Sequence, residues 1–113
     1  MAKYSVIADL HCHTVASDHA YSTITELANA AAEKGLVAVG CTDHGTGIQD
    51  APHMWHFYNL DALPDTISGV RVLRGVEANV MDFAGRLDME GDGLDRLEVG
   101  VASVPGGGVG VGA

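Results

Sequence analysis

The sequence has few basic residues, few cysteines and no long apolar run. Lys and Arg number 6 against 15 Asp and Glu, so that the formal net charge of the 113 residues is −9. This charge disfavours non-specific binding to nucleic acid or to an anionic membrane surface. No apolar stretch approaches the roughly 20 residues that a membrane-spanning helix requires. We therefore expect neither nucleic acid nor a membrane among the partners.

Cysteine is equally scarce, and the two thiols, Cys12 and Cys41, form no C-x-x-C motif. The opening segment MAKYSVIADL runs directly into a strand-like pattern and lacks the longer apolar core and the cleavage site of a signal peptide. We therefore expect a cytoplasmic protein. Because disulfides are rare in that compartment, we interpret both cysteines as reduced residues of the core.

The chain does have the composition of one globular domain, with 47% hydrophobic and 19% charged residues. Residues 3–10 are rich in strand formers, and residues 36–42 form a short apolar run that is typical of a buried parallel strand. Between them, residues 24–34 carry apolar side chains at helical spacing, directly after the capping-box pattern Thr23-x-x-Glu26. A strand, a helix and a strand in this order predict a βαβ unit.

The rest of the chain predicts two more strands, at residues 70–80 and 97–104. A long connection covers residues 43–69, with one helix expected after Pro52, and residues 81–96 read as an acidic, turn-rich excursion. The predicted fold is α/β with mainly parallel strands, and the sheet has an open edge on each side.

The last segment, residues 105–113, has five glycines among its nine residues. We interpret it as a flexible tail that lies outside a domain of residues 1–104. Its formal match to G-x-G-x-x-A has no helix after it, and therefore does not indicate a dinucleotide site.

Ligand-type side chains gather where the predicted strands end. The segment DLHCHTVASDHAYS, residues 9–22, places His11 and His13 at the end of the first strand. His44 follows the second strand in CTDHG, and Glu77 lies near the end of the third in RGVEAN. The carboxyl ends of parallel strands meet at one edge of the sheet. A single histidine at a strand end is commonly structural, but this set predicts a metal site.

Imidazole and carboxylate are the groups that zinc prefers at catalytic sites. One metal could bind His11, His13 and Glu77. His19 and His44 are then left, and they could hold a second ion if the loop after the first strand folds back. The two oxygens of Glu77 could bridge the pair.

Further side chains are candidates for supporting roles. On an alternating strand, Asp9 shares a face with His11 and is suited to accept an N–H from a ligand imidazole, and Asp43 is another candidate for this role. His53 and His56, in APHMWHFYNL, could line a substrate pocket or contact phosphate. The alternative is that these two histidines are partly exposed loop residues.

Four motifs, DLHCHTVASDHAYS, CTDHG, DAPHMWHF and LRGVEANV, together resemble the PHP domain (polymerase and histidinol phosphatase). The resemblance runs from about residue 5 to about residue 104 and is closest to bacterial PHP phosphatases with a trinuclear zinc site. It implies that the chain forms the N-terminal part of a distorted (β/α)7 barrel, in which the metals lie at the carboxyl edge of the strands.

By this resemblance, His11, His13 and Glu77 bind one metal, Glu77 bridges to a second, and His19 and His44 bind a third. The implied cofactor is zinc, up to three ions, with manganese or iron as alternatives. The implied reaction is the hydrolysis of a phosphorylated small molecule, a phosphomonoester, by a metal-bound water, with no side chain assigned as the catalytic group.

The resemblance covers roughly the first half of the family pattern. Where the family has a further ligand histidine after its fourth strand, this chain has Pro105, and the later ligands have no counterpart. We therefore expect weak, partial metal binding and little or no turnover. The alternative is a non-catalytic fragment that binds metal or self-associates through its open sheet edges. An exonuclease draws on the same motifs but fits less well, because the APHMWHFYNL loop resembles the phosphatase subgroup and no basic groove is apparent.

Overall fold

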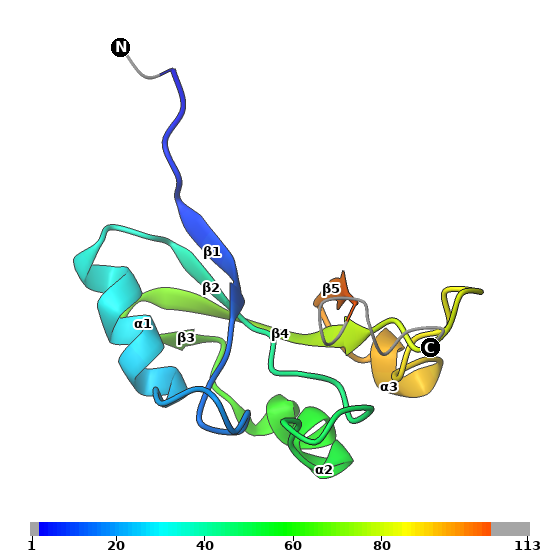
Figure 1. Cartoon of the computed structure of the whole chain (residues 1–113). Helices are drawn as coiled ribbons and strands as arrows, with labels where there is room; N and C mark the ends of the chain where they lie inside the picture. Colours follow the sequence, from blue (N-terminus) through cyan, green and yellow to red (C-terminus); the bar gives the residue numbers. More distant parts are fainter. Residues whose placement is uncertain (1–2, 105–113) are drawn as a thin grey trace.

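The computed structural model describes residues 3–104 of the chain (Figure 1). Its elements, in chain order, are β1 (Ala8–Cys12), α1 (Ile24–Glu33), β2 (Ala38–Cys41), α2 (Met54–Tyr58), the 3-10 turn η1 (Asn59–Ala62), β3 (Thr66–Ile67), β4 (Val70–Asn79), α3 (Asp92–Asp95) and β5 (Val99–Ser103). The glycine-rich segment 105–113 lies outside the described residues, so the domain boundary at residue 104 stays a prediction.

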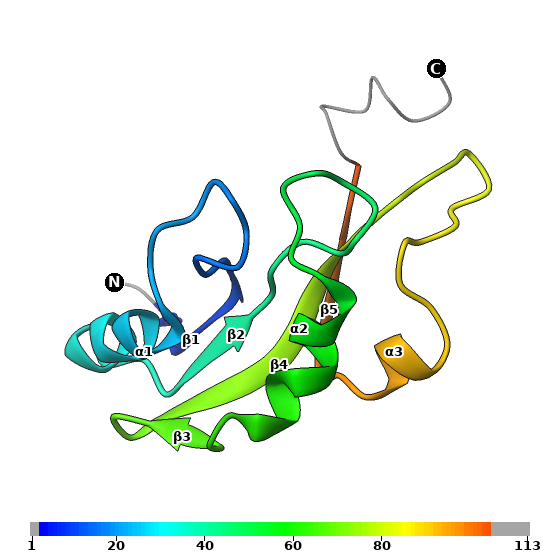
Figure 2. The same ribbon diagram turned by 90° about the horizontal axis from the view of Figure 1, so that it is seen from below.

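The long strand β4 organises the sheet, because each half of it has its own neighbours. β2 pairs in parallel with the first half of β4, and β1 pairs in parallel with β2. β3 pairs antiparallel with the start of β4, and β5 pairs in parallel with its second half. The sheet curls into half of a barrel (Figures 1 and 2). This confirms the predicted α/β fold with mainly parallel strands, as part of a (β/α) barrel.

Helix α1 packs on one face of the sheet through small side chains. Ala28 and Ala31 of the helix are buried against Val39 of β2 and against Val70 and Val72 of β4. Alanine at these positions lets the helix approach the strands closely, and the three valines are the β-branched residues that favour strands. The predicted capping box begins this helix: the Thr23 side chain accepts from the backbone N–H of Glu26, and the Glu26 side chain accepts from that of Thr23.

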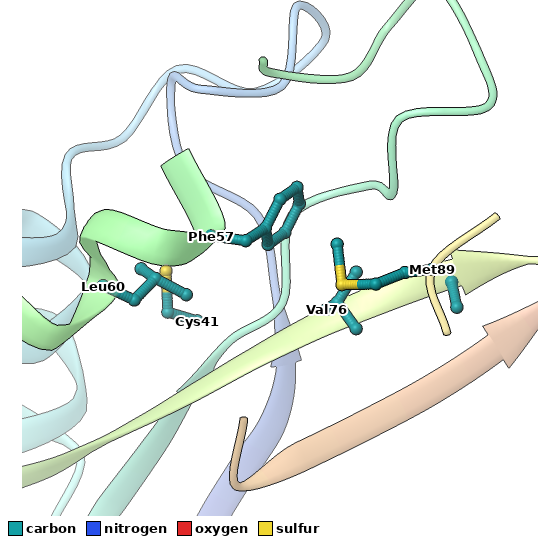
Figure 3. Packing of buried hydrophobic residues seen from close by; sticks show 6 residues of the cluster. Cys41, Phe57, Leu60, Val76 and Met89 are labelled. Carbon is teal, nitrogen blue, oxygen red and sulfur yellow. The ribbon is translucent and has the colours of Figure 1, made fainter. Parts of the chain in front are cut away.

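A second cluster covers the remaining length of β4 on the same face. Phe57 and Leu60, from α2 and η1, pack against Cys41 and Val76, and Met89 closes the cluster from the segment after β4 (Figure 3). Residues of β4 alternate between the two faces of the sheet. Glu77, which follows Val76, therefore lies on the opposite face, away from the helices.

The short strand β3 and the one-turn helix α3 were not predicted from the sequence. β3 exists because Ser68 and Gly69, with φ of 55° and 77°, form a two-residue turn that folds Ile67 back onto Val70. Positive φ at both central residues is the property of a type I′ hairpin turn. The predicted first strand is also shorter than expected and starts at Ala8. In the part of the chain that the structure describes, no helix has the length and apolar character needed to cross a membrane.

Candidate metal centre at the carboxyl edge of the sheet

The backbone pairing between β2 and β4 continues beyond the end of β2 and brings His44 beside Glu77. The N–H of Glu77 donates to the carbonyl of Asp43 (2.9 Å), and the N–H of Gly45 donates to the carbonyl of Glu77 (2.8 Å). His44 and Glu77 are thereby direct partners in a parallel bridge. Their proximity is thus fixed by main-chain hydrogen bonds before any side chain contributes.

His11 and His13 converge on the same carboxylate. The Nε2 atom of each ring lies 2.6 Å from Oε1 of Glu77. The ring of His13 also meets that of His44 edge-on, with 4.4 Å between the centroids. Three imidazoles from the ends of two strands therefore surround one carboxylate from a third, as the sequence predicted for this edge of the sheet.

The negative charge of Glu77 is stabilised by the side chains around its carboxylate. Burial by itself raises the pKa of Glu77, but hydrogen bonds from Ser103, His11 and His13 outweigh it and lower the pKa to about 2. The Nδ1 atom of His44 is buried without a hydrogen-bond partner, 3.9 Å from Oε2 of Glu77. An ionised carboxylate and an unpaired buried imidazole nitrogen are the features expected where a cation belongs.

Asp9 does not share the orientation of His11 and His13. The register of β1 against β2 is irregular between Asp9 and Cys12, which interrupts the alternation of side chains. Asp9 lines a small cavity with Cys12 and Leu27, while its carboxylate accepts the backbone N–H of His11 (3.2 Å). Its role as the acceptor for a ligand imidazole stays a prediction, without a ring contact in the described residues.

Asp43 anchors the loop that follows β1. Its buried carboxylate accepts the backbone N–H of Thr14 (2.7 Å), the hydroxyl of Thr14 (2.8 Å) and the hydroxyl of Ser17 (2.8 Å). Burial raises the pKa of Asp43, but the nearby His56 and these hydrogen bonds lower it by a larger amount. The pKa of Asp43 therefore lies below its ordinary value. Asp43 thus fixes the loop that carries His13 and His19, and no predicted ligand donates to it among the described hydrogen bonds.

The loop after β1 does fold back, and Asp50 receives it. The N–H of Asp18 donates to the carbonyl of Asp50 (3.0 Å), and Nδ1 of His19 lies 2.9 Å from Oδ1 of Asp50. Nε2 of His44 lies 3.8 Å from Oδ2 of the same residue. His19 and His44 are therefore brought to opposite sides of one carboxylate, and Figure 2 shows the loops after β1 and β2 rising side by side.

His53 and His56 have separate positions. His53 is exposed, and its Nδ1 accepts the N–H of Trp55 (3.1 Å), so that it caps α2. His56 is half-buried, with Nε2 3.4 Å from Oδ2 of Asp43 but unaligned for a hydrogen bond. It borders a cavity of about 380 Å³ that is lined mostly by apolar side chains, among them Leu60. Their assignment to a substrate pocket stays a prediction.

The side chains at the edge fit a divalent transition metal. The ligand atoms of His11, His13 and Glu77 lie within 4.8 Å of one another. Cys41, Asp43 and His56 are equally close, but the oxygens of Asp43 already accept three hydrogen bonds from Thr14 and Ser17 and a fourth from the thiol of Cys41. We therefore place the candidate centre at Glu77 rather than at Asp43.

Sequence reasoning missed Asp50 and Asp88. Asp88 joins the loop after β2 to the end of β4, since its carboxylate accepts from the N–H of Gly47 (2.8 Å) and from that of Asn79 (2.9 Å). Asp50 stands within the quoted motif DAPHMWHF, directly before Ala51, which is the one signal that could have singled it out. Asp88 lies in a segment that predicted only turns, and no local pattern marked it.

The structure is therefore part of an α/β barrel whose mainly parallel strands gather imidazoles and a carboxylate, a candidate set of metal ligands, at the carboxyl edge. The PHP domain model matches residues 9–99, and the chain belongs to the PHP domain family.

Curated relatives agree with this membership. The chain is 49% identical over 96 residues to a "Probable phosphatase" of Shewanella piezotolerans, a match that covers 85% of this chain and 39% of the relative. It is 46% identical over 97 residues to a "Probable phosphatase" of Acetivibrio thermocellus, covering 86% of this chain and 40% of the relative. The chain thus spans about two fifths of the length of the curated relatives that it matches.

Proposed function

We propose that this chain carries part of the metal centre of a metal-dependent phosphoesterase. The observation that carries the proposal is the convergence of His11 and His13 on Glu77, each with 2.6 Å between Nε2 and Oε1, beside the unpaired Nδ1 of His44. Membership of the PHP domain family and relatives named as probable phosphatases support the reaction class.

The side chains divide the work of such a site. His11, His13 and Glu77 would hold one ion, with Glu77 able to reach a second, and His19 and His44 would hold a third. A divalent metal in this position supplies a lowered water pKa and a Lewis acid for the phosphate oxygens. Glu77 keeps its negative charge over the physiological pH range because its pKa is about 2, and neutral imidazoles complete a ligand set that carries little charge.

We assign zinc as the metal, with manganese or iron as alternatives, and a phosphomonoester of small size as the substrate, in the cytoplasm. Clustered divalent ions would supply the positive charge that a chain of net charge −9 lacks. The same acidity argues against nucleic acid and anionic membranes as partners. Because His19 and His44 give only two protein nitrogens, we expect the 113-residue chain alone to bind metal weakly and to turn over little.

The first test is the metal content of monodisperse protein, purified without chelator or added metal and measured by elemental analysis. We expect zinc at less than one ion per site, and less in H11A and E77Q. H53A is the matched control, because His53 caps α2 away from the cluster and its loss should leave the metal content unchanged. Equal metal content in wild type, H11A and E77Q would contradict the proposed centre.

A non-catalytic fragment that binds metal or self-associates is the second candidate, and the observation that favours it is that the chain covers 39% to 40% of the length of its relatives. Hydrolysis of a generic phosphomonoester by homogeneous protein separates the two candidates. Turnover that is lost in H11A and E77Q, while both variants keep the wild-type circular dichroism spectrum, supports the enzyme. Metal binding without turnover supports the fragment.

A further inference from the structure

Asp50 contacts both histidines of the proposed third metal position. Its Oδ1 accepts the backbone N–H of His19 (2.9 Å) and lies 2.9 Å from Nδ1 of the same ring. Its Oδ2 lies 3.8 Å from Nε2 of His44. Neither the metal-ligand pattern in the sequence nor the names of the relatives assign a role to this carboxylate.

The position of Asp50 is fixed from several sides. Its carbonyl accepts the N–H of Asp18 (3.0 Å), so main chain and side chain both bind the loop after β1. The Asp50 side chain is 16% exposed, whereas that of His19 is 86% exposed. The ring of His19 therefore has few packing contacts of its own, and its orientation depends on the carboxylate.

The contact between Asp50 and Nδ1 of His19 determines which nitrogen of the His19 ring carries the proton. A neutral imidazole carries a proton on only one of its two nitrogens. When that N–H donates to a partner, the other nitrogen has a free lone pair and can bind a metal. A carboxylate can only accept hydrogen bonds, so the 2.9 Å contact places the proton on Nδ1 of His19. Its Nε2 is then the ligand atom.

We propose that Asp50 is a positioning residue, which holds His19 in the Nδ1–H tautomer and turns its Nε2 toward an ion shared with His44. This inference rests on the proposed metal centre. At 3.8 Å, Oδ2 is too far from His44 to accept a hydrogen bond, so the proposed role of Asp50 runs through His19 alone.

The competing role is that Asp50 is itself a metal ligand. Oδ1 already faces two donors of His19, which favours the positioning role, while Oδ2 accepts no described hydrogen bond. The two roles differ in a measurable way. A positioning residue acts through His19 and has no effect when that histidine is absent, whereas a ligand contributes independently.

The first measurement is the tautomer of His19 in metal-free, full-length protein at a pH where the ring is neutral, from long-range ¹H–¹⁵N correlations of the imidazole. We expect the Nδ1–H form in wild type and in D82A, and loss of that preference in D50A. Asp82 is the matched control, since its carboxylate also accepts two backbone N–H groups, of Ala84 and Arg86, in a different loop. A wild-type His19 in the Nε2–H form would overturn the proposal.

The second measurement is zinc affinity by competition with a chromogenic chelator, for wild type, D50A, H19A and the double variant. Loss of a carboxylate that orients a ligand histidine typically weakens metal binding about 10- to 100-fold, and we expect this for D50A and no change for D82A. D50A should add nothing in the H19A background. A further loss there would make Asp50 a ligand and overturn the positioning role, as would wild-type affinity in D50A.

The zinc-binding measurements distinguish a failure of the proposed metal centre from a failure of the role proposed for Asp50. If no variant of His11, His19 or Glu77 changes zinc binding, the metal centre itself is refuted, and the inference falls with it. If H11A and E77Q lose metal while D50A does not, the centre stands and only the role of Asp50 is refuted.

Discussion

Single carboxylates decide how the loops at the edge of the sheet are held. Asp43 is completely buried, and its carboxylate accepts hydrogen bonds from the loop after β1 and from the thiol of Cys41, but none from a predicted ligand ring among the described residues. A buried charge is tolerated when it is fully hydrogen-bonded, and it then becomes difficult to replace. The residue that was proposed as a partner of a ligand imidazole therefore also acts as the anchor of the loop that carries His13 and His19.

Replacing Asp43 by alanine should be strongly destabilising. D43A leaves the N–H and hydroxyl of Thr14 and the hydroxyl of Ser17 without their acceptor, at about 1–3 kcal/mol for each group that stays buried and unpaired. We expect a loss of about 3 kcal/mol in the free energy of unfolding, measured in urea. D82A, which removes an exposed loop carboxylate, is the control. A loss in D43A no larger than in D82A would show that the anchor is unimportant.

The lowered pKa of Glu77 predicts a dependence of stability on pH in the metal-free protein. The pKa is about 2 in the folded state against 4.5 ordinarily, so the stabilisation is present above about 4.5 and is lost as the pH falls toward 2. In E77Q the unfolding free energy should therefore fall less steeply across this window. E33Q, at the end of α1, should follow the wild-type profile. Parallel profiles for E77Q and wild type would contradict the assignment.

At the scale of elements, the approach of β1 to β2 depends on a glycine. A side-chain carbon on Gly40 would lie 2.6 Å from the carbonyl oxygen of Leu10 and 2.9 Å from its carbon, both of which are backbone atoms that cannot rotate away. β1 carries His11, so this packing also sets the position of a predicted ligand. The irregular register between Asp9 and Cys12 lies beside the same contact.

G40A should accordingly separate β1 from β2 and weaken the metal site. Overpacking of this kind costs about 1–3 kcal/mol, which we expect as a lower unfolding free energy in urea. G100A is the matched control, because Gly100 lies in β5 and the nearest atom to its added carbon is a methyl group of Leu94 in α3, at 4.0 Å. Equal stability of the two variants would show that the sheet accommodates the methyl group.

At the scale of the whole molecule, the half-barrel leaves both margins of its sheet without a further strand in the described residues. β1 pairs only with β2, and β5 only with β4. The margin at β1 is apolar, with Ile7 58% exposed and Leu10 46% exposed. Unpaired, apolar strand edges are templates for association with another chain, which is the physical basis of the self-association proposed for this protein.

A charge on the β1 margin should suppress this association. We expect wild type to show a sedimentation coefficient that rises with protein concentration, and L10K to remain monomeric, because a lysine on an edge strand opposes pairing. A32K, which places the same charge on the exposed side of α1, should behave as wild type. Monomeric wild-type protein at all concentrations would refute self-association.

The sequence by itself determined those features of the structure that depend on residues close together in the chain. The alternation and apolar runs of β2, β4 and β5, the capping box of α1 and the ligand-type residues at successive strand ends are local patterns, and they predicted the α/β fold and the edge where His11, His13, His44 and Glu77 meet. These features were accessible because hydrogen-bonding periodicity and side-chain preference act over a few residues.

The tertiary structure decided which distant groups meet. Asp50 receives His19 across 31 residues, Asp43 holds Thr14 across 29, and the register of β1 against β2 shifts between Asp9 and Cys12. No local pattern encodes these pairings, because each depends on where two loops are delivered by the whole sheet and on the buried polar groups that must then find partners. The sequence therefore determined the chemistry available at the carboxyl edge, and the packing of the loops decided which carboxylate orients which histidine.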